Sequence, residues 1–173
     1  MPKYLYVFLD NIIMNENDNH LPVYGVGPFL IAPIVGTALL FLILSYYSMI
    51  PVYKIDSMDF IFLALGIFFI LCGIIFWILA VTSRIDEKIK ANQLETTGVY
   101  SIIRHPIYAA FLYISIGLIL ISGNVCLLGL IVVYWAFLTY ILKNTEEKWL
   151  IDCYGDDYIN YSKKVNRFFP KVI

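Results

Sequence analysis

The chain has 173 residues, of which 61% are hydrophobic and only 14% are charged. Soluble domains carry about 25% charged residues, so this composition indicates an integral membrane protein, with residues 1–173 as a single membrane domain. The formal net charge of −1 excludes a basic nucleic-acid-binding surface, and the three cysteines lack the spacing of a disulfide framework or a metal site. We therefore expect the bilayer, lipids and small molecules as partners, with no nucleic acid and no metal.

Two apolar segments follow an N-terminal segment over residues 1–24, and both are long enough to cross about 30 Å of hydrocarbon. Residues 25–50 have Pro28 and Pro33 near their start, where a helix tolerates proline best. Residues 60–81 carry no charge. Both segments are predicted to be transmembrane helices. Gly66 and Gly73 in the second segment are predicted to lie at close contacts between helices. The same is predicted for Gly117 and Gly129 in the apolar region that follows.

Residues 107–142 are predicted to form a transmembrane helical hairpin. Two apolar runs are separated only by Gly123 and Asn124, and this break is a turn signal. One continuous helix would be nearly twice as long as a bilayer requires. The first arm is short, about 24 Å, so it must begin at or before Arg104-His105-Pro106 in order to cross. Arg104 and His105 are therefore expected at the membrane surface.

The positions of lysine and arginine predict the orientation in the membrane. With both termini in the cytoplasm, eleven of the twelve Lys and Arg residues face the cytoplasm, and only Lys54 lies outside. Residues 83–106 are then a cytoplasmic loop, and residues 143–173 are a cytoplasmic C-terminal segment. Apolar residues at helical spacing predict an amphipathic surface helix in that segment. The expected fold is all-α and polytopic, with about four transmembrane helices.

The hairpin brings polar side chains from distant positions to one depth. His105 lies about 19 residues before the turn and Glu146 about 22 residues after it, roughly 28 and 33 Å along their helices. Charged groups and imidazole are costly at the edge of a bilayer and are rarely found there without a partner or a ligand. One pocket can therefore be lined by Arg104, His105, Tyr108, Glu146 and Glu147, with Tyr100 entering from the preceding loop.

These side chains suit a zwitterionic ligand. Arg104 and His105 can bind a carboxylate or a phosphate, and Glu146 can bind an ammonium group or ribose hydroxyls. Tyrosines can stack on a base or face a cation. S-adenosylmethionine has all of these groups. The residues alone support a second interpretation equally well. In it, Arg104 forms an ion pair with Glu146 or Glu147 that holds the two ends of the hairpin together and binds no ligand.

Several motifs of the C-terminal half recur together, in the same order, in a known family of membrane enzymes. They are Leu94–Tyr108, Gly117, Asn124, Glu146-Glu147, Tyr154–Tyr161, Val165 and Arg167–Pro170. Over about 80 residues they resemble the isoprenylcysteine carboxyl methyltransferase family, whose wider group includes phospholipid N-methyltransferases. The resemblance implies an integral membrane, multi-pass methyltransferase that binds S-adenosylmethionine on its cytosolic side, between the hairpin and the C-terminal segment.

The resemblance also implies which residues form the site. Cofactor contacts fall on Gln93, Leu94, Glu95, Tyr100, His105, Pro106, Tyr108 and Glu146. Catalytic groups are expected at Arg104, His105 and Glu147. A carboxylate acceptor is already ionised at neutral pH, whereas an amine acceptor must lose a proton, which Glu147 or His105 would take.

The chain departs from the family at Leu142. The family usually has an arginine four residues before the first glutamate of the pair, associated with the methyl-accepting group, and this chain has Leu142 there. Lys143 is adjacent, but lysine does not replace a bidentate arginine. Leu142 and Lys143 are predicted to line the acceptor site. The expected acceptor is the carboxylate of an isoprenylcysteine-like lipid or protein, or a lipid amine.

The sequence is also compatible with two other functions for a membrane protein of this fold. Sterol-type membrane reductases have a related hairpin and bind NADPH, but they tend to show Asn-Tyr and then Gly-Glu after the Arg-x-Pro element. This chain reads Ile107-Tyr108-Ala109-Ala110 there. A non-catalytic membrane binding protein is favoured only by Leu142.

Overall fold

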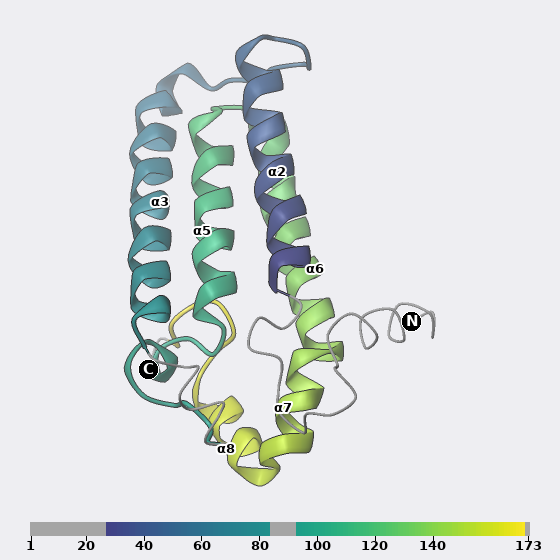
Figure 1. The fold of residues 1–173 in the computed structure, drawn as a ribbon. Helices are drawn as coiled ribbons and strands as arrows, with labels where there is room; N and C mark the ends of the chain where they lie inside the picture. The colour runs from purple at the N-terminus through teal and green to yellow at the C-terminus, as the bar shows by residue number, and fades with distance from the viewer. Residues whose placement is uncertain (1–26, 84–92, 172–173) are drawn as a thin grey trace.

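The computed structural model describes residues 27–83 and 93–171, and all regular elements in these ranges are helices (Figure 1). The long helices are α2 (Gly27–Tyr46), α3 (Asp59–Val81), α5 (Pro106–Ile121) and α6 (Leu128–Asn144). Two short helices, α7 (Glu146–Tyr154) and α8 (Asp156–Lys164), lie at one end of this bundle (Figure 1). The predicted N-terminal segment, together with Arg84, Lys88 and Lys90, lies outside the described residues, so the orientation in the membrane stays a prediction.

The helices correspond closely to the predicted segments. Residues 25–50 contain α2, residues 60–81 lie in α3, and the predicted hairpin consists of α5 and α6. Three stretches are long and apolar enough to cross a membrane, judged by length and composition: Phe29–Tyr46, Asp59–Val81 and Val125–Tyr154. With 16 residues, α5 is a shorter apolar helix. The all-α, polytopic membrane fold is therefore confirmed, with three long spans and one short one.

The C-terminal tail contains two short helices where the sequence predicted one amphipathic helix. Gly155 has a φ of 52°, a conformation that glycine adopts readily, and it ends α7. Asp156 and Asp157 then begin α8, where the helix dipole favours acidic side chains. The chain therefore turns between α7 and α8, and α8 lies below the bundle in the view of Figure 1.

Close contact between α3 and α5 depends on glycine. A Cβ atom at Gly117 would lie 2.5 Å from the carbonyl oxygen of Gly66, and one at Gly73 would lie 2.6 Å from that of Ala110. Small residues allow two backbones to approach where lipid gives no hydrophobic drive for helix association. The prediction of close packing is confirmed for these glycines. It is wrong for Gly129, where a Cβ atom would meet nothing within 4 Å because that face of α6 is exposed.

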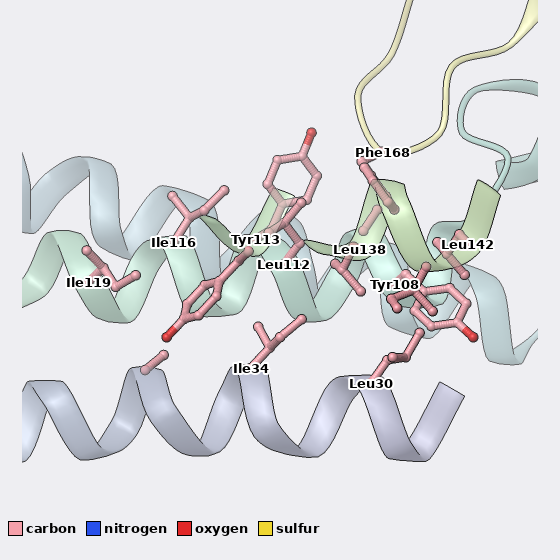
Figure 2. Close-up of a cluster of buried hydrophobic side chains, with 14 of the residues drawn as sticks. Leu30, Ile34, Tyr108, Leu112, Tyr113, Ile116, Ile119, Leu138, Leu142 and Phe168 are labelled. Atoms are coloured by element: carbon pink, nitrogen blue, oxygen red, sulfur yellow. The ribbon is translucent and has the colours of Figure 1, made fainter. Parts of the chain in front are cut away.

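Helix α5 lies at the centre of the bundle, and most of its side chains are buried. Side chains of α2, α5 and α6 meet in one hydrophobic cluster (Figure 2). Phe168, from the chain after α8, is also part of this cluster and is only 2% exposed. The C-terminal segment is thus anchored in the core of the bundle. The labelled members in Figure 2 are Leu30, Ile34, Tyr108, Leu112, Tyr113, Ile116, Ile119, Leu138, Leu142 and Phe168.

Asn124 joins the hairpin turn to the connection between α2 and α3. Its amide nitrogen donates to Ser45 Oγ at 3.2 Å and to the Pro51 carbonyl at 3.0 Å. Its amide oxygen accepts from the backbone N–H groups of Tyr53 and Cys126, both at 3.3 Å. Asn124 is almost fully buried, and a buried polar side chain is tolerated when its groups are hydrogen-bonded. This network fixes one end of α5.

Gly117→Ala is expected to destabilise the protein by about 1 to 3 kcal/mol, because the added methyl group overpacks the α3–α5 interface. Gly129→Ala is the matched control, since it adds the same methyl group to a helix where space is open. Thermal unfolding in lipid nanodiscs measures both variants. Equal melting temperatures for the two variants would contradict a glycine-dependent interface.

Candidate functional site

Five polar side chains lie at the end of the bundle where α5 and α7 begin, and we call this cluster the hairpin foot. It consists of Arg104, His105, Tyr108, Glu146 and Glu147. Local sequence explains how the chain presents them. Pro106 begins α5, at a position where its missing N–H group costs nothing. Thr145 interrupts the helical conformation with φ −123° and ψ −92°, so α7 begins anew with the two glutamates in its first turn.

Glu147 contacts charged side chains from two other segments of the chain. Arg167 donates to both of its oxygens, from Nε at 2.7 Å and from Nη2 at 2.6 Å. Arg104 Nη1 lies 3.2 Å from Glu147 Oε1, and His105 Nε2 lies 3.3 Å from the same oxygen. The Glu147 side chain is only 8% exposed. One carboxylate therefore connects the start of α5, the start of α7 and the C-terminal segment through charge-assisted hydrogen bonds.

Glu146 lies on the other side of the imidazole. The Tyr108 hydroxyl donates to Glu146 Oε1, and Glu146 Oε2 lies 3.8 Å from His105 Nδ1. The Glu146 side chain is 16% exposed, twice the value for Glu147. His105 is thus held between two carboxylates, with Nε2 toward Glu147 and Nδ1 toward Glu146.

Two tyrosines of α8 hold the segment that precedes α5. Tyr158 accepts a hydrogen bond from Arg104 Nη1 at 3.1 Å, and Tyr161 donates to the Tyr100 carbonyl at 2.5 Å. Burial, and then the negative charge of Glu147, raise the pKa of Tyr158 to about 12. The Tyr158 hydroxyl therefore stays neutral at physiological pH. Burial also raises the pKa of Tyr161 above its usual range.

The C-terminal segment pairs with the chain just before α5. Ile103 and Asn166 form a parallel β-bridge. The Arg104 N–H donates to the Asn166 carbonyl at 2.9 Å, and the His105 N–H donates to the Arg167 carbonyl at 3.2 Å. The sequence placed Arg167 in a family motif but gave it no role. Its contacts depend on this pairing, which no local pattern predicts.

The predicted cofactor-binding residues of the loop before α5 do not share one environment. Gln93 and Leu94 line an open pocket of about 860 Å³ whose opposite wall is α8. Glu95 accepts hydrogen bonds from the Thr97 backbone N–H and hydroxyl group at 2.7 and 2.6 Å. Tyr100 is buried against Ala80 and Val99. The full lining of the pocket is Gln93, Leu94, Thr96, Ser101, Tyr154, Asp157, Asn160, Tyr161, Lys164 and Val165, which includes no member of the hairpin foot.

The two predicted acceptor residues differ sharply in burial. Leu142 is 0% exposed and packs in the hydrophobic cluster, near Tyr108 and Leu138 (Figure 2). Lys143 is exposed. Gly27, at the start of α2, lies close to the Tyr108 hydroxyl, where a Cβ atom would meet it at 3.5 Å. The surroundings of Tyr108 away from Glu146 are therefore apolar, and a role of Leu142 or Lys143 in acceptor binding stays a prediction.

Comparison with known proteins identifies the family. Residues 34–157, more than half of the chain, match the family described as phospholipid methyltransferase. The chain belongs to this family. Proteins named protein-S-isoprenylcysteine O-methyltransferase share 38%, 36% and 33% identity with it over 88 residues, in Xenopus laevis, Schizosaccharomyces pombe and Homo sapiens respectively. These matches cover 50% of this chain and 30%, 37% and 31% of those relatives, so the chain matches about a third of their length.

Tyr161→Phe is expected to lower stability by about 1 to 3 kcal/mol, because it removes the buried hydrogen bond from the Tyr161 hydroxyl to the Tyr100 carbonyl. Hydrogen exchange over residues 97–103 should become faster at the same time, since that segment loses its connection to α8. Tyr154→Phe, on a half-buried tyrosine of α7, is the control. Unchanged exchange in Tyr161→Phe would show that α8 does not hold this segment.

Proposed function

We propose that this protein is a methyltransferase that moves a methyl group from S-adenosylmethionine to a lipophilic acceptor at the hairpin foot. The observation that carries the proposal is the position of His105 between Glu146 and Glu147 at the polar end of an apolar bundle. Membership of the phospholipid methyltransferase family supports it, as do relatives named for methyl transfer to isoprenylcysteine.

The donors and acceptors of the hairpin foot fit this cofactor. Glu146, the more exposed carboxylate of the pair, can accept from an ammonium group or from ribose hydroxyls. Arg104 Nε is buried and has no hydrogen-bond partner among the described residues. A buried donor without a partner is costly, so this nitrogen is suited to the carboxylate of a ligand.

The chain's own residues have three tasks in this reaction. When bound, the cofactor supplies a methyl group on a positively charged sulfur. Tyr108 and Glu146 orient the ligand, and the apolar surroundings exclude water. For an amine acceptor, His105 takes the proton at Nδ1, because Nε2 is turned toward Glu147. Glu147, already bonded to Arg167 through both oxygens, supports His105.

The acceptor is expected to be a membrane lipid or a prenylated molecule that enters from the bilayer. The family description favours a phospholipid, whose acceptor would be an amine, and the named relatives favour the carboxylate of an isoprenylcysteine. The excess of lysine and arginine in the segments at this end of the bundle supports a cytoplasmic orientation of the site.

Purified protein in nanodiscs is expected to bind S-adenosylmethionine, and His105→Ala and Glu146→Ala should each weaken binding about tenfold or more, since each removes a charged or hydrogen-bonding contact. Isothermal titration calorimetry measures the Kd. Asp152→Ala removes an exposed carboxylate of the same helix α7 and is the control. Normal binding by both site variants, or binding of NADPH in place of S-adenosylmethionine, would remove the proposed function.

Incubation with S-adenosylmethionine labelled in the methyl group and a total membrane extract is expected to label a lipid-soluble product. A methyl ester loses the label in mild base and an N-methyl group retains it, so this treatment separates a carboxylate acceptor from an amine. His105→Ala provides the background. Label that appears only in water-soluble products would contradict a lipophilic acceptor.

A further inference from the structure

The chain after α8 forms an irregular segment, residues 165–169, that pairs with the chain at the start of α5, and we call it the C-terminal strap. Two of its backbone carbonyls, those of Asn166 and Arg167, accept from the N–H groups of Arg104 and His105. Phe168 is buried in the core, and the Phe169 ring meets the Tyr113 ring edge-on at 5.5 Å. The strap is therefore fixed on both sides of its one charged residue.

Arg167 is that residue, and it forms the shortest contacts of Glu147. Its two bonds, at 2.7 and 2.6 Å, occupy both carboxylate oxygens in parallel, which sets the plane of the carboxylate as well as its position. Arg104 approaches the same carboxylate with Nη1 alone, and that nitrogen also donates to Tyr158. The hydrogen bonds to Glu147 raise the pKa of Arg167, so the guanidinium keeps its charge.

Arg167 consequently acts on His105 from two directions. Its backbone carbonyl accepts from the His105 N–H, which fixes the backbone at the start of α5. Its side chain orients Glu147, whose Oε1 lies 3.3 Å from His105 Nε2. In a neutral imidazole only one nitrogen carries the proton, and a neighbouring carboxylate selects the nitrogen that faces it. Glu146 Oε2, at 3.8 Å from Nδ1, lies beyond hydrogen-bond distance, so Nδ1 is the nitrogen without a proton.

We propose that Arg167 is a positioning residue that keeps the proton of His105 on Nε2 and leaves Nδ1 free to act toward a ligand or an acceptor. The proposal rests on the proposed function only in that His105 serves the ligand site. A lysine at this position would give a single contact, because it cannot span two oxygens. The strap is thus a part of the site rather than a tail beyond it.

The first experiment observes His105 without any ligand. The chain has two histidines, so His20→Gln leaves His105 as the only one, and ¹⁵N-labelled histidine then reports on one ring. At pH 8 the parent is expected to show a protonated Nε2 and a bare Nδ1. Arg167→Met should give averaged nitrogen signals from a mixture of both forms. An identical spectrum in parent and variant, or a protonated Nδ1 in the parent, overturns the proposal.

The second experiment measures binding of S-adenosylhomocysteine, the cofactor product, by calorimetry. Arg167→Met is expected to raise the Kd about tenfold, the size that loss of a charged hydrogen-bonding pair produces. The Kd of Arg167→Lys should lie between those of Arg167→Met and the parent. Because lysine keeps the positive charge, this variant also serves if Arg167→Met does not fold. Lys171→Met removes an exposed cation four residues further along the chain and should bind normally.

A double-mutant cycle with Glu147→Gln tests the route of the effect. If Arg167 acts through Glu147, adding Arg167→Met to Glu147→Gln should change the Kd by less than twofold. Full additivity would indicate that Arg167 contacts the ligand directly, and it overturns a positioning role. If the parent binds no S-adenosylhomocysteine, the proposed function fails, and the nitrogen spectra still decide whether Arg167 positions His105.

Discussion

The carboxylate of Glu147 is the interaction on which the polar end of this bundle depends. An isolated charge in apolar surroundings costs several kcal/mol, and the cost falls only when partners surround it. Here the partners come from separate segments: Arg104 and His105 precede α5, and Arg167 lies in the C-terminal strap. The start of α5, the start of α7 and the strap can therefore form their native arrangement only together.

Packing in the apolar part of the bundle fixes the position of the hairpin foot. His105 and Tyr108 lie at one end of helix α5, and this helix is held along its length by the glycine contacts with α3 and by the core around Phe168. At the opposite end, the Asn124 network fixes the turn. A site built on a helix with so many constraints keeps its side chains in place before any ligand arrives, which lowers the cost of binding.

The sequence predicted the hairpin and its foot because arm lengths determine depth. The two apolar runs on either side of Gly123-Asn124 have similar lengths, which predicts that His105 and Glu146 lie at the same depth, close together. Arg167 was missed as a partner of Glu147, because an irregular segment has neither periodicity nor a fixed distance from the turn. The surroundings of Leu142 could not be predicted either, since the direction of a side chain on an apolar helix depends on its neighbours. The break at Gly155 was a local signal that could have divided the tail into α7 and α8.

The unequal lengths of adjacent helices have a consequence for the depth of the site. Helix α3 has 23 residues and α5, packed along it, has 16. At 1.5 Å per residue, α5 covers about 24 Å, less than the roughly 30 Å of hydrocarbon in a typical bilayer. Most side chains of α5 are covered by the neighbouring helices, so its short length places the hairpin foot close to the edge of the hydrocarbon, where a lipid can present its polar group without leaving the membrane.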